Sequence, residues 1–120
     1  MIGDSFDGLD LFITETKNDI RHRLQGAARA AFHTATQLTP VDRGYLKNSW
    51  TLTIDNPHYR DSERAGPGVM ADLRYIRADS NIYLTNGKSY AEYVNDGTPN
   101  MPAHNMLEHA VAAAMDELEE

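Results

Sequence analysis

The sequence predicts an α+β protein, in which a long N-terminal helix and a C-terminal helix pack on a small antiparallel β-sheet. Apolar and small residues recur at steps of three and four near both ends of the chain, as on one face of a helix. Short stretches between the ends are rich in β-forming residues and are separated by glycine, proline and asparagine. The 120 residues suffice for a single domain, 1–120, with one core.

The first element is a helix predicted over residues 9–38. Its apolar face carries Phe12, Thr16, Ile20, Leu24, Ala27, Ala31, Ala35 and Leu38. Asp7 or Asp10 is placed to cap its start, and Pro40 ends it because proline disfavours a helical residue before it. The helix would measure roughly 45 Å, more than a small domain easily covers. Its face packs on the domain's own sheet or, through the small residues 26–31, lets another backbone come close.

The segment after Pro40 predicts a short helical turn and then a strand. Asp42 is placed to cap the turn, and Leu46 and Trp50 lie four residues apart on one side of it. Trp50 is expected to anchor the core, since tryptophan buries a large area. From Trp50 the sequence WTLTI alternates in polarity, as a half-buried strand does. Residues 55–68 predict a loop or hairpin tip, which is a candidate mobile segment.

The second half of the chain predicts further strand and a final helix. Residues 69–77 are ambiguous, with strand favoured, whereas residues 82–84 form a clear strand before the turn signal Asn86-Gly87. His104 or Asn105 is placed to cap the last helix. One broad face of this helix carries Met106, Leu107, Ala110, Val111, Ala114, Met115 and Leu118.

Residues 89–103, which we call the elbow, connect the last strand to the last helix. Tyr90, Tyr93 and Val94 have the spacing of one helical turn and are expected to pack this turn onto the sheet. Gly97 is suited to end the turn in a left-handed conformation. The prolines that follow it hold an extended connector to the last helix.

Composition and charge exclude several classes of protein. The absence of cysteine excludes disulfides and thiolate zinc sites, and it fits a reducing compartment. No signal peptide is evident, and no apolar run reaches the roughly 20 residues that span a bilayer, so we expect a soluble protein made in the cytoplasm, without a membrane partner. The net charge is −7, and residues 81–120 hold one lysine against seven acidic residues. Such a surface disfavours wrapping of nucleic acid but suits a protein that lets DNA slide past.

The sequence offers no convincing catalytic or metal-binding group. His104 and His109, with Glu108 between them, are five residues apart, whereas two ligands on one helical face need a spacing of three or four. His22 and His33 can share a face of the long helix, but no third ligand is evident. Nucleophile motifs and phosphate-binding loops are absent from the sequence. We therefore predict no catalytic residue, cofactor or metal; a small hydrolase or nuclease is a remote alternative.

Three phrases of the sequence resemble a known family when they are taken together. The phrases are TPVDRGYLKNSW (39–50), IYLTNGKSYAEYVNDGT (82–98) and MPAHNMLEHAV (101–111). They resemble tailed-bacteriophage neck or tail-completion proteins related to the lambda minor tail protein Z. The matching positions are Thr39, Pro40, Val41, Asp42, Gly44 and Leu46, then Thr85, Asn86, Tyr90, Ala91, Tyr93, Val94, Gly97 and Thr98, then Met101, Pro102, Ala103 and Leu107. The chain departs from the family at Arg43, Asn95, Asn105 and Met106, where we expect surface or packing substitutions.

The resemblance implies a structural virion protein that completes the tail and joins it to the DNA-filled head. It implies a homo-oligomeric ring of about six subunits around the DNA channel, with tail-end and head-connector proteins as partners. DNA would pass through without specific binding. A tail terminator and a head-side connector of the same neck are alternatives, as is a free-standing regulatory binding protein. The residues assigned to the family motif and to candidate subunit contacts are Asp42, Gly44, Leu46, Trp50, Asn86, Tyr90, Tyr93, Val94, Gly97, Thr98 and Pro102.

The resemblance leaves two roles open. The elbow either packs the monomer alone or also presents an edge to the next subunit. The acidic last third either lines the channel or forms a solvated helix face.

Overall fold

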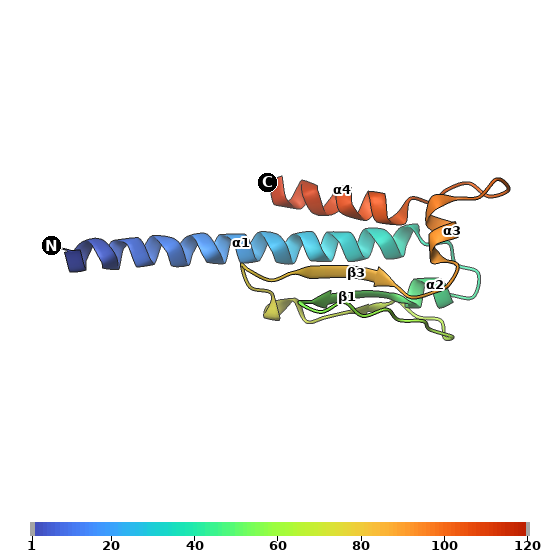
Figure 1. The fold of residues 1–120 in the computed structure, drawn as a ribbon, viewed down its shortest axis with the longest axis horizontal. Helices are drawn as coiled ribbons and strands as arrows, with labels where there is room; N and C mark the ends of the chain where they lie inside the picture. Colours follow the sequence, from blue (N-terminus) through green and yellow to red (C-terminus); the bar gives the residue numbers. More distant parts are fainter. Residues whose placement is uncertain (1, 120) are drawn as a thin grey trace.

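The computed structural model describes residues 2–119, with side chains from residue 16 onward. It confirms the predicted α+β fold, with a long N-terminal helix, a C-terminal helix and a small sheet. The elements are α1 (Ile2–Leu38), α2 (Tyr45–Asn48), β1 (Trp50–Ile54), β2 (Val69–Met70), the 3-10 turn η1 (Leu73–Tyr75), β3 (Ile82–Asn86), α3 (Ala91–Asp96) and α4 (Met106–Glu119). Figure 1 shows α1 as the middle layer between α4 and the sheet, so α4 packs on α1 and not directly on the sheet.

The long helix begins earlier than the sequence predicted. It starts at Ile2, so Asp7 and Asp10 lie inside it and neither caps its start. It ends at Leu38, two residues before Pro40, as predicted.

Among the described side chains, those of the predicted apolar face of α1 that pack lie in the C-terminal half of the helix. Ala27, Ala31 and Ala35 are buried there, where small side chains let α4 lie close. Ile20 and Leu38 are exposed, because they lie towards the two ends of the packed region. The prediction for Phe12 falls outside the described side chains.

The sheet has the strand order β2-β1-β3 and is mixed, not purely antiparallel as predicted. β1 pairs antiparallel with β3, from Trp50 opposite Asn86 to Ile54 opposite Ile82. β2 pairs parallel with β1, with Thr51 opposite Val69. Residues 55–68 run back along the sheet before β2 starts, which makes this pair parallel. Of the ambiguous residues 69–77, only the first two form strand, and η1 follows because the Asp72 carboxylate accepts the backbone N–H of Arg74 at 3.0 Å.

Two side chains between α2 and β1 fix the path of residues 55–68. Asn48 Nδ2 donates to Ser62 Oγ at 2.8 Å, and Ser49 Oγ accepts the backbone N–H of Ser62 at 2.8 Å. Asn48, Ser49 and Ser62 are all buried. These hydrogen bonds hold the middle of the segment, at Ser62, against the residues that precede β1. The mobility of the rest of the segment stays a prediction.

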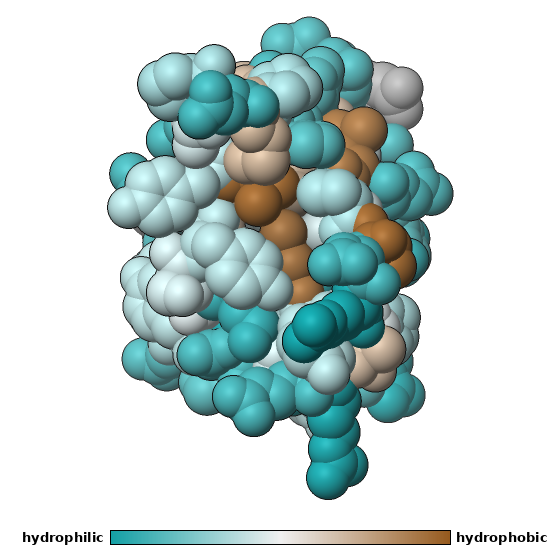
Figure 2. Space-filling model, turned by 90° about the vertical axis from the view of Figure 1, so that its right-hand side faces the viewer, coloured by the Kyte–Doolittle hydropathy of each residue, from teal (hydrophilic) through white to brown (hydrophobic). Residues whose placement is uncertain are grey.

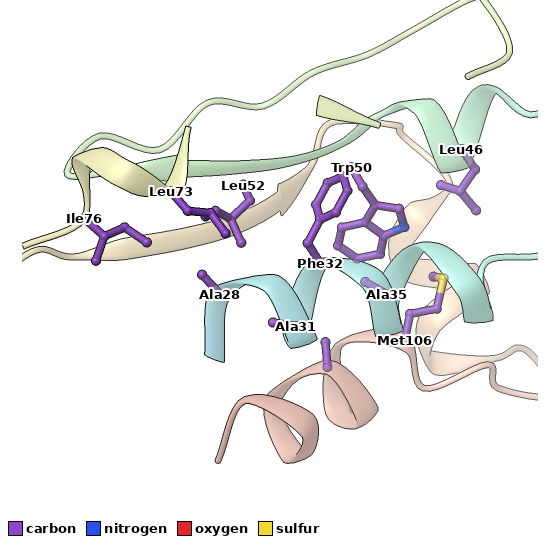
Figure 3. Packing of buried hydrophobic residues seen from close by; sticks show 11 residues of the cluster. Ala28, Ala31, Phe32, Ala35, Leu46, Trp50, Leu52, Leu73, Ile76 and Met106 are labelled. Atoms are coloured by element: carbon purple, nitrogen blue, oxygen red, sulfur yellow. The ribbon is translucent and has the colours of Figure 1, made fainter. Parts of the chain in front are cut away.

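Trp50 anchors the core, as the sequence predicted. Its side chain is 2% exposed, and Figure 3 shows it beside Phe32 of α1, with Met106 approaching from the start of α4. The indole Nε1 donates to Thr39 Oγ1 at 2.7 Å, and the Thr39 hydroxyl donates in turn to the Ala35 carbonyl oxygen at 2.6 Å. The only polar atom of the indole thus has a hydrogen-bond partner in Thr39, the residue that follows α1.

Candidate functional site: the hollow at the elbow end

The three phrases meet at one end of the molecule, although the first is separated from the other two by more than 30 residues of sequence. The end of α1, α2, the end of β3 and the elbow lie together there (Figure 1). A hollow of about 770 Å³, which we call the elbow hollow, opens between them. Figure 2 looks onto this end and shows apolar atoms recessed between more polar side chains. The lining residues are Pro40, Asp42, Arg43, Gly44, Tyr45 and Leu46 of the first phrase, Lys88, Tyr90 and Val94 of the second, Met101 of the third, and Glu63.

Gly44, and not Asp42, stands at the start of α2. Its φ is +80°, a left-handed conformation, and a Cβ on it would lie 2.8 Å from the Cβ of Ala65. No described side chain caps α2, so the prediction that Asp42 does was wrong. The glycine itself turns the chain into the helix, which leaves Asp42 exposed at the rim of the hollow.

Lys88 holds one wall of the hollow together. Its side chain is only 10% exposed, and Nζ lies 2.7 Å from Asp61 Oδ1. The same ammonium lies 5.6 Å from the ring centre of Tyr45 and 5.9 Å from that of Tyr90, within range of a cation–π interaction. The hydrogen bond to Asp61 raises the pKa of Lys88, although burial acts to lower it. Sequence reasoning missed Lys88 because its partners lie on other elements.

Asn86 joins β3 to α2 at the edge of the hollow. Its Nδ2 donates to the Leu46 carbonyl oxygen at 2.8 Å, and its Oδ1 accepts the backbone N–H of Lys88 at 3.1 Å. β3 ends at Asn86, as the turn signal predicted, but the chain continues into α3 and forms no hairpin there.

Gly97 reverses the chain at the end of α3. Its φ is +80° with ψ 171°, so the predicted positive φ is confirmed, but the conformation is extended and not helical. Thr98 and Met101 then exchange two backbone hydrogen bonds, of 2.8 and 3.1 Å, and close a tight loop. Pro102 is exposed in the connector to α4.

The elbow tyrosines do not pack onto the sheet as predicted. Tyr93 is 61% exposed and Tyr90 is 42% exposed. Ala91 and Val94, three residues apart, take the inward face of α3 and pack against the core. A helix this short buries one face, so the two aromatic rings remain at the surface beside the hollow.

Asn95 connects the elbow to α4, a role that sequence reasoning missed. It is 5% exposed, its Oδ1 accepts the backbone N–H of Leu107 at 2.9 Å, and its Nδ2 donates to Glu108 Oε1 at 2.8 Å. Asn95 therefore caps α4 from outside, in place of the predicted His104 or Asn105. The latter has a φ of +49°. At Asn95 the sequence departs from the pattern of the family that it resembles. The Asn95 side chain is buried and hydrogen-bonded to α4, so this difference is not a surface substitution.

Replacing Asn95 with alanine is expected to lower the free energy of unfolding by about 1–2 kcal/mol, because it leaves a helix N–H and the Glu108 carboxylate without their partner. Urea denaturation measures the change. Asn100→Ala, an exposed position in the elbow loop, is the matched control and is expected to stay within about 0.5 kcal/mol of the parent. Equal losses in the two variants would contradict the capping role.

Among residues 16–119, no three metal-binding side chains gather in one place. Glu108 is engaged by Asn95, and His104 Nδ1 lies 3.3 Å from the Val94 carbonyl oxygen. None of the described helices is long and apolar enough to cross a membrane.

No family model, curated protein or solved structure matches the chain.

Proposed function

We propose that this protein is a structural component of a tailed-bacteriophage virion that completes the tail and joins it to the head. It would assemble in the cytoplasm of the bacterial host as one subunit of a ring of about six copies around the DNA channel. The observation that supports this proposal most is the meeting of the three family-like phrases at one end of the fold. Apart from Glu63, every residue that lines the elbow hollow belongs to one of them.

The chemistry of the hollow suits contact with another protein. Leu46 and Val94 give it apolar surface, and Tyr90 adds a partly exposed ring. Asp42 and Arg43 place charges of both signs among its lining residues. Tyrosine and arginine are enriched where proteins bind each other, because each combines a large contact area with a polar group. Subunits or connector proteins of the neck are the partners that we propose for this end.

The pKa and the pairing of the charged groups in the hollow favour a binding role over catalysis. An active site commonly perturbs the pKa of a group that reacts. The group in the hollow with a shifted pKa is Lys88, and its shift keeps it charged and paired with Asp61. This lysine supports the wall of the hollow through its ion pair with Asp61.

The acidic surface suits passage of DNA. α4 carries Glu108, Asp116, Glu117 and Glu119 and contains no lysine or arginine. Where such a face lines a channel, it repels the phosphate backbone, so DNA moves through without specific binding.

Joining can be tested by mixing DNA-filled heads and tails of the parent phage, both made without this protein. Adding the protein is expected to restore infectious particles. Tyr93→Asp in the elbow is expected to reduce the yield about 30-fold, as loss of an interface anchor worth about 2 kcal/mol would. Tyr75→Asp, at an exposed tyrosine on η1, is the control and should leave the yield unchanged. An equal yield with and without the protein would refute the joining role.

A further inference from the structure

β3 forms one edge of the sheet. It pairs with β1, and no other strand of the described residues pairs with it. The Asp55 backbone N–H, just past the end of β1, donates to the Asn81 carbonyl oxygen at 2.7 Å. Hydrogen-bonded pairs alternate along an antiparallel ladder, so the backbone groups of residues 83 and 85 face β1. Those of Ile82 and Leu84 therefore point away from β1.

A second hydrogen bond agrees with this alternation. The Ala71 backbone N–H donates to the Leu52 carbonyl oxygen at 2.9 Å, so Leu52, which lies opposite Leu84, bonds towards β2 and not towards β3. No group among the described residues bonds to the outward N–H and C=O groups of Ile82 and Leu84. An open edge of this kind is a template for a further strand.

Two hollows border this edge of β3. One, of about 350 Å³, lies over alanine side chains of α1, and the other, of about 370 Å³, reaches α3. Leu84 of β3 and Leu107 of α4 line both hollows, so together they form one groove, which we call the edge groove. Thr85 also lines the second hollow. Successive residues of a strand point to opposite faces, so a hollow that touches both Leu84 and Thr85 lies at the edge of β3 itself.

The α4 wall of the edge groove is apolar and uncovered. Leu107, Val111 and Met115 recur every four residues along it and are 40%, 59% and 49% exposed. The short alanine side chains of α1 at the floor leave room for the side chains of an occupant. The groove thus offers apolar contacts beside a row of backbone hydrogen-bonding groups.

We propose that the edge groove binds an extended segment of a partner protein, which pairs with β3 as a fourth strand of the sheet. The backbone of the segment bonds to Ile82 and Leu84, and every second side chain points into the groove towards α1 and α4. These inward side chains are apolar, because the groove wall that they meet is apolar. The inference goes beyond the proposed function, since strand addition requires no phage component.

The open edge selects an extended chain over a helix. A helix bonds its backbone groups internally, so it would leave the outward groups of Ile82 and Leu84 without partners. An extended chain presents N–H and C=O groups at the same spacing as β3, whose five residues span about 17 Å. α4 is about 21 Å long and can contact the whole added segment.

Charge further defines the segment. The charged residues that line the groove are Glu92 and Asp96 of α3, both exposed, and the Asp, Glu, Lys and Arg positions of α4 are all acidic. A segment with lysine or arginine at the end that passes α3 therefore complements the groove.

A second copy of this chain fits the groove less well than a different protein. The described strands of a second copy are already paired within their own sheet, so the copy would have to offer its own β3 edge. Antiparallel pairing of two β3 strands places both acidic α4 helices on the same side of the joined sheet, where they repel each other.

Selection from a random-peptide library displayed on yeast tests the chemistry of the segment. Peptides that bind the parent protein, and do not bind a Val111→Asp variant, are expected to be apolar at every second position and to carry a basic residue at one end. Selected peptides with apolar residues at steps of three and four, or no enrichment on the parent over the variant, would overturn the proposal.

A synthetic copy of a selected peptide tests the backbone pairing. N-methylation of alternate residues removes either the N–H groups that face β3 or those that face away. We expect the first set to lower the affinity about tenfold or more and the second set to change it much less. The amide hydrogens of Ile82 and Leu84 should also exchange more slowly when the peptide is bound. Equal losses for the two methylated sets would contradict strand addition.

Two matched variants of the protein test the place of binding. Val111→Asp is expected to weaken binding of the synthetic peptide about tenfold or more. Ala112→Asp, at an exposed neighbour on α4 that does not line the groove, adds the same charge and should leave binding unchanged. Equal binding by both variants and the parent would overturn the groove as the site. A dimer of the parent in sedimentation experiments that Val111→Asp dissociates would assign the groove to a second copy and overturn the proposed partner.

Discussion

Replacing Trp50 with alanine is expected to lower the free energy of unfolding by about 3–5 kcal/mol. The indole is almost fully buried between β1 and α1, and its loss leaves a cavity as well as a Thr39 hydroxyl without its donor. Since small domains are stable by only about 5–15 kcal/mol, the variant would lose a large part of its stability.

Urea denaturation followed by circular dichroism measures this loss, because Trp50 is the single tryptophan and its fluorescence disappears with it. Trp50→Phe keeps an aromatic ring and removes only the Nε1–Thr39 hydrogen bond and part of the volume, so it should lose clearly less. Tyr75→Ala, at a side chain that is 74% exposed, should change stability by less than about 0.5 kcal/mol. A loss below about 1 kcal/mol for Trp50→Ala would show that the core does not centre on this residue.

Replacing Gly97 with alanine is expected to lower the free energy of unfolding by about 2–4 kcal/mol and to abolish the proposed joining activity. At φ +80° and ψ 171° any Cβ is strained. The added carbon would lie 2.7 Å from the Ala103 backbone nitrogen and 3.0 Å from the Met101 carbonyl oxygen. Relief of these contacts requires the elbow loop to open, which moves Met101 at the wall of the hollow.

Gly26→Ala is the matched control for this substitution. Gly26 lies inside α1, where its Cβ would meet only the far end of the Glu117 side chain at 3.3 Å. Alanine favours helix over glycine, so this variant should be neutral or more stable by up to about 1 kcal/mol. Equal stability of the two variants would mean that the elbow tolerates a side chain at position 97.

Local periodicity was sufficient to predict the presence and order of the long helices and of β1 and β3, but not the start of α1 or the burial of Thr51, which is 3% exposed although it was predicted on the solvent face of β1. The end of α1, the inward Trp50 and Leu52 of β1, and the stop at Gly97 each depend on a few neighbouring residues, and the structure confirms them. The parallel β2 was not predictable in this way, because it depends on where residues 55–68 cross the sheet. That path is fixed by Asn48 and Ser49 bonding to Ser62, a contact between distant positions.

The candidate site likewise combines features that the local sequence predicts with contacts between distant residues that it does not predict. The phrases at residues 39–50, 82–98 and 101–111 were identified from the sequence, but the hollow that residues of all three line was visible only in the fold. Lys88 and Asn95 were missed because their partners, Asp61 and Leu107, lie on other elements. The elbow tyrosines were misplaced, since spacing alone does not tell which face of a short helix is buried.

The most direct test of the proposed neck role is the mass of the purified protein, alone and after addition of tail tubes. We expect a ring of about six copies, either free in solution or formed on the tube end. A protein that stays monomeric at all concentrations and does not bind the tubes would contradict it.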